Sequence, residues 1–146
     1  MASLSRQEVL RLLQRDWAEY IHQFHSLTPQ EQSAFLTRQG YARFADLLAH
    51  IVAWWRVCHQ AVERYAADAT AKPIEYDVDA FNARAVAEVS QLDEEQVIES
   101  FEKMRRFLIE FVEGLPKAAF ENEKIVDQLE MDFVGHLREH QVVERE

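Results

Sequence analysis

Turn-forming residues are scarce in this chain, and that scarcity limits what it can fold into. Three glycines and three prolines occur among its 146 residues, whereas a protein built from many short strands needs a turn signal between successive strands. The sequence therefore predicts a few long helices. Because 48% of the residues are hydrophobic, the chain can bury one sizeable core. We expect a single all-α domain, a helical bundle, over residues 1–146.

Apolar residues at three- and four-residue steps mark the helices of the expected bundle. Two helix starts carry capping boxes, Ser5 with Glu8 and Thr28 with Glu31, in which a hydroxyl and a glutamate satisfy free backbone N–H groups. Gly40 is expected to end the second, short helix, which connects longer ones. The predicted helical ranges are 5–25, 29–40, 43–69, 77–114 with a bend near Leu92, and 123 to at least 140. Within the fourth range, Asp93 and Gln96 can cap a fresh helix start.

Charge and hydropathy exclude several classes of function. The formal net charge is −10, and no cluster of Lys and Arg interleaved with aromatic residues suits a phosphate backbone, so we expect no nucleic-acid partner. No apolar run reaches the length of a membrane span and the N-terminus lacks a signal-peptide pattern, which predicts a cytoplasmic protein without a membrane partner. The single cysteine, Cys58, fits a reducing compartment and is expected to be a buried structural thiol.

Three histidines are the residues expected to carry chemistry. His136 and His140 lie four residues apart in the last predicted helix, so both imidazoles project from one face and can share a transition metal ion. His50 is proposed as the third ligand, because it is the only other histidine inside a strongly apolar helical stretch. Zn, Ni and Fe all accept imidazole ligands, so the residue type predicts one divalent transition metal without choosing among these three.

Each of these histidines also has a plainer interpretation. A histidine on the buried face of a helix is often a core residue whose ring nitrogen hydrogen-bonds a backbone carbonyl. The helix faces that carry the three histidines can meet in the core of a bundle, however, where such metal sites are built. Three buried polar groups without partners cost more free energy than one shared metal. We therefore favour a metal site and keep a purely structural role as the alternative.

Five further residues are candidates for the surroundings of the metal. Trp17, Trp54 and Phe133 are expected to line an aromatic cleft that excludes water and holds an apolar small molecule. Asn82 is an uncommon polar residue on an apolar stripe, and we propose it as a polar group of that pocket. Asp46 is a candidate for orienting a metal ligand through a hydrogen bond. Core packing is the alternative for the aromatic residues, and an Asp near a helix N-terminus needs no special role.

Four short features occur in order along the chain: residues 40–41 (GY), 46–54 (DLLAHIVAW), 81–84 (FNAR), and the last-helix pair His136 and His140. Together they resemble the DinB-like (DinB/YfiT) superfamily of metal-binding four-helix bundles, most closely its ClbS/DfsB-like group, over nearly the whole chain. The resemblance implies an up-up-down-down bundle with one long crossover, to which the sequence adds a short connecting helix. It also implies a divalent metal bound by His50, His136 and His140, and a homodimer.

The chemistry of the expected site suggests a class of reaction. A metal held by three neutral imidazoles keeps its charge and open positions, so it can activate a bound water or thiol or polarise a substrate oxygen. With the resemblance, this predicts a metal-dependent enzyme that acts on a reactive electrophile by hydrolysis or thiol transfer, in detoxification or stress protection. A bundle that binds a small molecule or metal without turnover is the alternative, and whether the chain is an enzyme stays open.

The second long predicted helix is apolar on more than one face. Val52 and Trp55 lie on faces that do not share the direction of His50. A helix that is apolar almost all round must be covered on more than one side. This pattern adds to the expectation of a homodimer.

Overall fold

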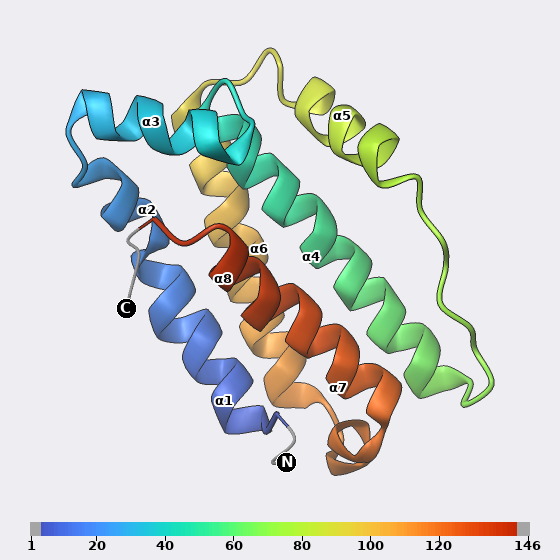
Figure 1. The fold of residues 1–146 in the computed structure, drawn as a ribbon. Helices are drawn as coiled ribbons and strands as arrows, with labels where there is room; N and C mark the ends of the chain where they lie inside the picture. The colour runs from blue at the N-terminus through green and yellow to red at the C-terminus, as the bar shows by residue number, and fades with distance from the viewer. Residues whose placement is uncertain (1–3, 143–146) are drawn as a thin grey trace.

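Residues 4–142 are described by the computed structural model, and within this range the chain is all-helical, without a β-strand (Figure 1). Each predicted helical range contains helix with nearly the predicted bounds, except that residues 77–114 hold two separate helices. The elements in chain order are α1 (Arg6–Arg11), the π-helical turn η1 (Leu12–Asp16), α2 (Trp17–His25), α3 (Pro29–Gln39), α4 (Phe44–Ala67), α5 (Val78–Glu88), α6 (Glu94–Gly114), the 3-10 turn η2 (Lys117–Glu121), α7 (Glu123–Leu129), the π-helical turn η3 (Glu130–Gly135) and α8 (His136–Glu139).

Local hydrogen bonds form the helix starts and stops. The Thr28 hydroxyl accepts the backbone N–H of Glu31 at 3.2 Å, and the Glu31 carboxylate accepts the Thr28 N–H at 2.9 Å. Gly40 ends α3 with a φ of 83°, a left-handed conformation that a Cβ disfavours. Asp93 caps α6 by accepting the N–H of Gln96 at 2.9 Å. This fresh start, which the sequence indicated at Asp93, separates α6 from α5, so the bend expected near Leu92 is a break between two helices.

Four long helical segments lie side by side in Figure 1: α1–η1–α2, α4, α6 and α7–η3–α8. Arg6, at the start of α1, donates to the Val112 carbonyl near the end of α6 at 2.6 Å, so the first and third segments run antiparallel. Lys124, at the start of α7, donates to the Ala71 carbonyl beyond the end of α4 at 2.8 Å. The second and fourth segments therefore also run antiparallel.

Two further pairs of segments, the second with the third and the first with the fourth, run parallel, and this changes the expected topology. Arg43, just before α4, donates to the Leu92 carbonyl just before α6 at 2.8 Å. The Tyr20 hydroxyl in α2 donates to the His140 carbonyl after α8 at 2.7 Å. The segments run up, down, down and up, so the expected up-up-down-down order is wrong. The short connection through α3 reverses the chain between the first two segments, and the one long crossover, residues 68–93, joins the second to the third.

Large aromatic side chains fill the core between the segments. Trp17, Trp55, Phe101 and Phe133 are fully buried. The rings of Trp17 and Trp55 meet edge to face with centroids 5.0 Å apart, and those of Trp55 and Phe101 are also 5.0 Å apart. Burying one such side chain stabilises the fold by about 1.5–3 kcal/mol. This packing fixes how each segment is rotated, and it thereby fixes which polar side chains point inward.

Two features of the fold matter for the site and were not predicted. The π-helical turns η1 and η3 interrupt the first and last segments, and such turns often occur at functional sites. The helices α3 and α5 lie outside the four segments (Figure 1), and each contributes one buried side chain, Phe35 and Ala85 respectively. None of the helices within residues 4–142 is both long and apolar enough to cross a membrane.

Candidate functional site

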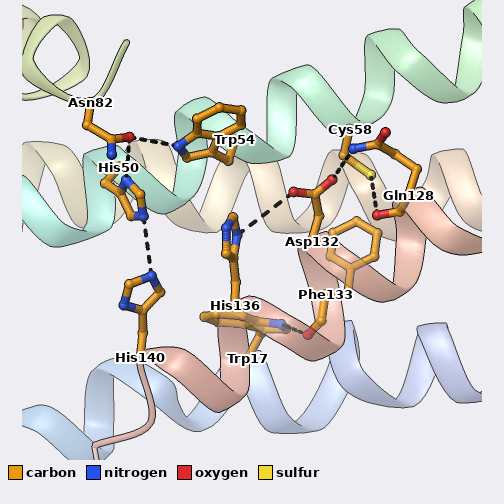
Figure 2. Close-up of polar contacts among 10 residues, drawn as sticks. All are labelled: Trp17, His50, Trp54, Cys58, Asn82, Gln128, Asp132, Phe133, His136 and His140. Atoms are coloured by element: carbon orange, nitrogen blue, oxygen red, sulfur yellow. Dashed lines mark hydrogen bonds and ion pairs between the residues drawn. The ribbon is translucent and has the colours of Figure 1, made fainter. Parts of the chain in front are cut away.

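Three imidazole rings come together where α4 faces the last segment (Figure 2). His50 projects from α4, His136 begins α8 and His140 follows it directly. The ring centroids of His50 and His140 are 5.0 Å apart, those of His50 and His136 5.7 Å, and those of His136 and His140 5.6 Å. His50 and His140 are each 7% exposed. The structure thus brings together the three residues predicted as ligands, which we call the histidine cluster.

Asn82 fixes the tautomer of His50. Its Oδ1 lies 3.0 Å from His50 Nδ1 and 2.8 Å from Trp54 Nε1. An indole nitrogen only donates hydrogen bonds, so the amide atom that it contacts is the oxygen. His50 Nδ1, which faces the same oxygen, must therefore carry its hydrogen, and Nε2 of the neutral ring carries a lone pair.

Gln39, the last residue of α3, fixes the tautomer of His140 in a comparable way. Its Oε1 lies 2.6 Å from His140 Nδ1, while its Nε2 donates to the Glu139 carbonyl at 3.2 Å. A backbone carbonyl only accepts hydrogen bonds, so the amide oxygen must be the atom that faces the imidazole. His140 Nδ1 therefore carries its hydrogen, and Nε2 of the neutral ring carries a lone pair.

The two Nε2 atoms face each other at 3.2 Å (Figure 2). Two lone pairs at this distance repel unless a proton or a cation lies between them. Burial lowers the pKa of His50 below its ordinary value, and burial with the nearby His50 and His136 lowers the pKa of His140 to about 3, so protonation is disfavoured at neutral pH. Two nitrogens bound at about 2.0–2.1 Å to one tetrahedral ion are about 3.3–3.4 Å apart. The observed separation is close to that value.

His136 belongs to the cluster but has a different orientation. Its Nδ1 is buried, lies 4.0 Å from Asp132 Oδ1 and has no hydrogen-bond partner in the described part of the chain. Burial, aided by His50, lowers the pKa of His136 to about 4. Within residues 4–142, no three His, Cys, Asp or Glu side chains already form a metal-binding group. His50 and His140 contact each other through Nε2, whereas His136 forms no hydrogen bond with either ring in the described part of the chain.

Asp132 is buried beside the cluster, in the π-helical turn η3. The side-chain amide of Gln128 donates to Asp132 Oδ2 at 2.6 Å. Burial raises the pKa of Asp132 to about 6, although hydrogen bonds from Gln128 and Cys58 oppose this shift. The carboxylate is therefore mostly ionised at neutral pH, near a histidine whose Nδ1 lacks an acceptor. A carboxylate in this position is typical of the residues that orient metal-bound imidazoles.

The structure separates the predicted pocket residues into two groups. Trp17 and Phe133 are 0% exposed, and Trp17 Nε1 donates to the Phe133 carbonyl at 3.1 Å. The predicted cleft lined by these two residues is therefore wrong, because no water-sized space reaches either side chain. Trp54 and Asn82 are half-buried beside the histidine cluster, and the ring of Trp54 packs on that of Phe81 with centroids 4.3 Å apart.

Asp46 has a different partner from the one expected. Its Oδ1 accepts hydrogen bonds from Arg43 Nε at 3.1 Å and from Arg43 Nη2 at 2.8 Å. In the described part of the chain it forms no hydrogen bond with a histidine. Its contact with Arg43 belongs to the start of α4, and Asn82 provides the oxygen that orients His50 instead.

The sequence-based reason for a homodimer is not supported. Val52 is 4% exposed and Trp55 is 0% exposed within the single chain. Both residues are covered by the protein's own core, since α4 packs against other segments on more than one side. These apolar faces therefore require no second copy to cover them.

Sequence reasoning missed Gln39 and Asp132. Asp132 stands four residues before His136, so the same helical spacing that paired the two C-terminal histidines also places this acid on their face. No comparable signal marks Gln39, which lies 101 residues from His140 along the chain. Only the packing of α3 across the end of the last segment brings this amide to the imidazole.

Two of the grooves beside α4 lie away from the histidine cluster. One of ≈ 580 Å³ runs between α4 and α6, with Arg56, Lys103 and Phe107 in its lining, and one of ≈ 220 Å³ runs between α4 and α5. Neither contains a member of the cluster. Although a large pocket is the usual first candidate for a functional site, the convergent ring nitrogens give the cluster the more specific chemistry.

Comparisons with protein-family models, with curated proteins and with solved structures find no match for this chain. A proposal for its function therefore rests on the geometry of the histidine cluster and on the sequence resemblance.

Proposed function

We propose that this chain binds one divalent transition metal, Zn, Ni or Fe, through His50, His136 and His140. The observation that carries the proposal is the 3.2 Å separation of His50 Nε2 and His140 Nε2, both of which carry lone pairs because both Nδ1 atoms donate to amide oxygens. A shared cation turns the repulsion between these lone pairs into attraction. Imidazole suits all three metals.

A purely structural role for the cluster is less well supported. A structural histidine pair would place an N–H donor of one ring against the acceptor of the other. Gln39 and Asn82 oppose that arrangement, since both use an oxygen to hold a hydrogen on Nδ1. The unpartnered Nδ1 of His136 is a second feature without a structural purpose.

The proposed activity is that of a metal-dependent enzyme of DinB-like type acting on a reactive electrophile, by hydrolysis or thiol transfer, in detoxification or stress protection. A bound metal would supply a Lewis acid that activates water or a thiol. The chain itself keeps the three histidine ligands neutral by burying them. Three protein ligands leave the fourth position of a tetrahedral metal open for water or a substrate. The protein has one long crossover, as the DinB-like resemblance implies, whereas the order of segment directions differs from the expected one.

Metal binding is tested by elemental analysis and zinc titration of protein purified without a histidine tag. We expect one metal per chain in the wild type, and loss of that metal in His140→Ala with the helical circular dichroism retained, because the aromatic core forms without the ion. His22→Ala, a change at an exposed histidine of α2, is the matched control and should bind like the wild type. A wild-type protein that binds no transition metal, or a His140→Ala variant that binds it equally well, would refute the proposal.

The reaction is tested separately. Metal-loaded protein is incubated with a panel of epoxide- and cyclopropane-containing compounds, with and without a low-molecular-weight thiol. Product formation that is lost in His140→Ala supports the enzyme, whereas retention of one compound per chain without product supports the alternative, a bundle that binds a small molecule or metal without turnover.

The homodimer remains a prediction of the resemblance, and sedimentation at micromolar concentration tests it: a monomeric mass contradicts it.

A further inference from the structure

The two amides that contact the histidine cluster come from the two helices outside the four-segment bundle. Gln39 ends α3, and Asn82 lies in α5. Each of these helices contributes a single buried side chain to the protein, so packing alone holds them less firmly than the bundle segments. Both nevertheless direct one amide inward to an imidazole. Because two separate peripheral helices make the same kind of contact, an amide oxygen against an imidazole Nδ1, we expect the contact to serve the histidine cluster.

We propose that Gln39 and Asn82 are positioning residues that hold His140 and His50 as the Nδ1–H tautomers, so that both Nε2 lone pairs point at one shared cation; this inference rests on the proposed metal site. In a neutral imidazole, the hydrogen bond made by one nitrogen decides which nitrogen carries the hydrogen. Here both Nδ1 atoms face amide oxygens, at 2.6 Å and 3.0 Å. Both rings are therefore set to ligate through Nε2.

A side-chain amide can serve this purpose only if it cannot flip, because its NH₂ end would select the opposite tautomer. Each amide is locked by a second contact of fixed polarity. Trp54 Nε1 can only donate, and it holds the oxygen of Asn82 in place at 2.8 Å. The Glu139 carbonyl can only accept, and it holds the NH₂ group of Gln39 at 3.2 Å. Trp54 thus acts on the cluster through Asn82.

The proposal also links the two peripheral helices to the metal. Partners that hold the second nitrogen of a metal-bound histidine orient the ring and raise its basicity, and their loss typically weakens metal binding about 10–100-fold. The linkage is reciprocal, because a contact that favours metal binding is itself favoured when metal binds. Metal should therefore slow amide hydrogen exchange in α3 and α5 more than in α6, which does not carry such a contact.

The tautomers are measured first, on metal-free protein, from the ¹⁵N chemical shifts of the imidazole nitrogens. We expect Nδ1–H and bare Nε2 for both His50 and His140 in the wild type. Asn82→Leu should release His50 from this state, and Gln39→Leu should release His140, whereas Asn82→Asp keeps an acceptor oxygen for both of its donors and should retain it. Nε2–H tautomers in the wild type, or unchanged shifts in both leucine variants, would overturn the proposal.

Zinc affinity is then measured by competition with a chromophoric chelator. Both leucine variants should bind zinc about 10–100-fold more weakly than the wild type, and Asn82→Asp should bind close to the wild type. Gln30→Leu, at an exposed glutamine of the same helix as Gln39, should change nothing. If zinc binds and the leucine variants bind it equally well, the positioning role fails while the metal site stands. If the wild type has the expected tautomers but binds no metal, the proposed function fails and the tautomer assignment stands.

Discussion

Acidification should destabilise the metal-free protein through the histidine cluster. Burial lowers the pKa of His136 to about 4 and of His140 to about 3, from an ordinary value of 6.5. At a pH between the folded and unfolded pKa values, the two imidazoles are protonated in the unfolded chain and neutral in the folded chain. The free energy of unfolding therefore falls as the pH falls. The stabilising contribution of these two neutral rings is therefore complete above pH 6.5 and is lost progressively below it.

The size of this effect follows from the same values. Both folded pKa values lie below pH 5, so each of the two histidines should cost about 2 kcal/mol of unfolding free energy between pH 7 and pH 5. Asp132 acts in the opposite direction, because burial raises its pKa to about 6 from 3.8 and the folded protein takes up a proton first. Protonation of Asp132 in the folded protein raises the unfolding free energy by about 1 kcal/mol between pH 7 and pH 5. The net loss from His136, His140 and Asp132 is then about 2–3 kcal/mol.

The assay is urea unfolding at pH 7 and pH 5 in the presence of a chelator, for the wild type, His140→Gln and the exposed control His22→Gln. The loss of stability on acidification should be smaller by about 2 kcal/mol in His140→Gln than in the wild type, because one buried titrating ring is gone. The control should behave as the wild type does. An equal loss in all three proteins would refute the view that the cluster is buried and neutral.

Three further predictions concern single residues. Asp132→Asn should enlarge the loss of stability between pH 7 and pH 5 by about 1 kcal/mol, because the buried carboxyl no longer takes up a proton; an unchanged loss in the same urea experiment would contradict the raised pKa. Cys58 is buried, and burial raises the pKa of its thiol, so Ellman's reagent should react with it only as the protein unfolds, and rapid labelling of folded protein would show that it is accessible. Gly40→Ala should destabilise the fold by about 1–2 kcal/mol, since nothing lies within 4 Å of the added Cβ and its φ of 83° is the source of strain; a melting temperature equal to that of the wild type would contradict this.

The positions of the helices could be predicted from the sequence because the signals that set them are local. The capping box at Thr28 and the left-handed Gly40 bound α3 through contacts within a few residues. Asp93 and Gln96 likewise mark the start of α6 through a local capping box, although the sequence had joined α5 and α6 into one helical region with a bend. The π-helical turn η3 was also missed, since an extra residue in one helical turn has no sequence signal that these patterns contain.

Composition could not distinguish a core aromatic residue from one that lines a pocket. Trp17, Trp54 and Phe133 look alike in a sequence, because each is a large ring on an apolar helix face. Trp17 and Phe133 are enclosed by the core, while Trp54 lies half-buried against α5. The difference depends on which segment lies opposite each ring, and that is a property of the packing and not of the local sequence.

The sequence by itself determined the candidate ligands, since a helical spacing of four residues and an apolar context select His50, His136 and His140 without any knowledge of the fold. The tertiary structure alone decided how these rings are used. It brings His50 and His140 from 90 residues apart to an Nε2–Nε2 distance of 3.2 Å, and it brings Gln39 and Asn82 to their Nδ1 atoms. The physical reason is that a tautomer depends on the partner of each nitrogen, and these partners meet only when distant segments pack.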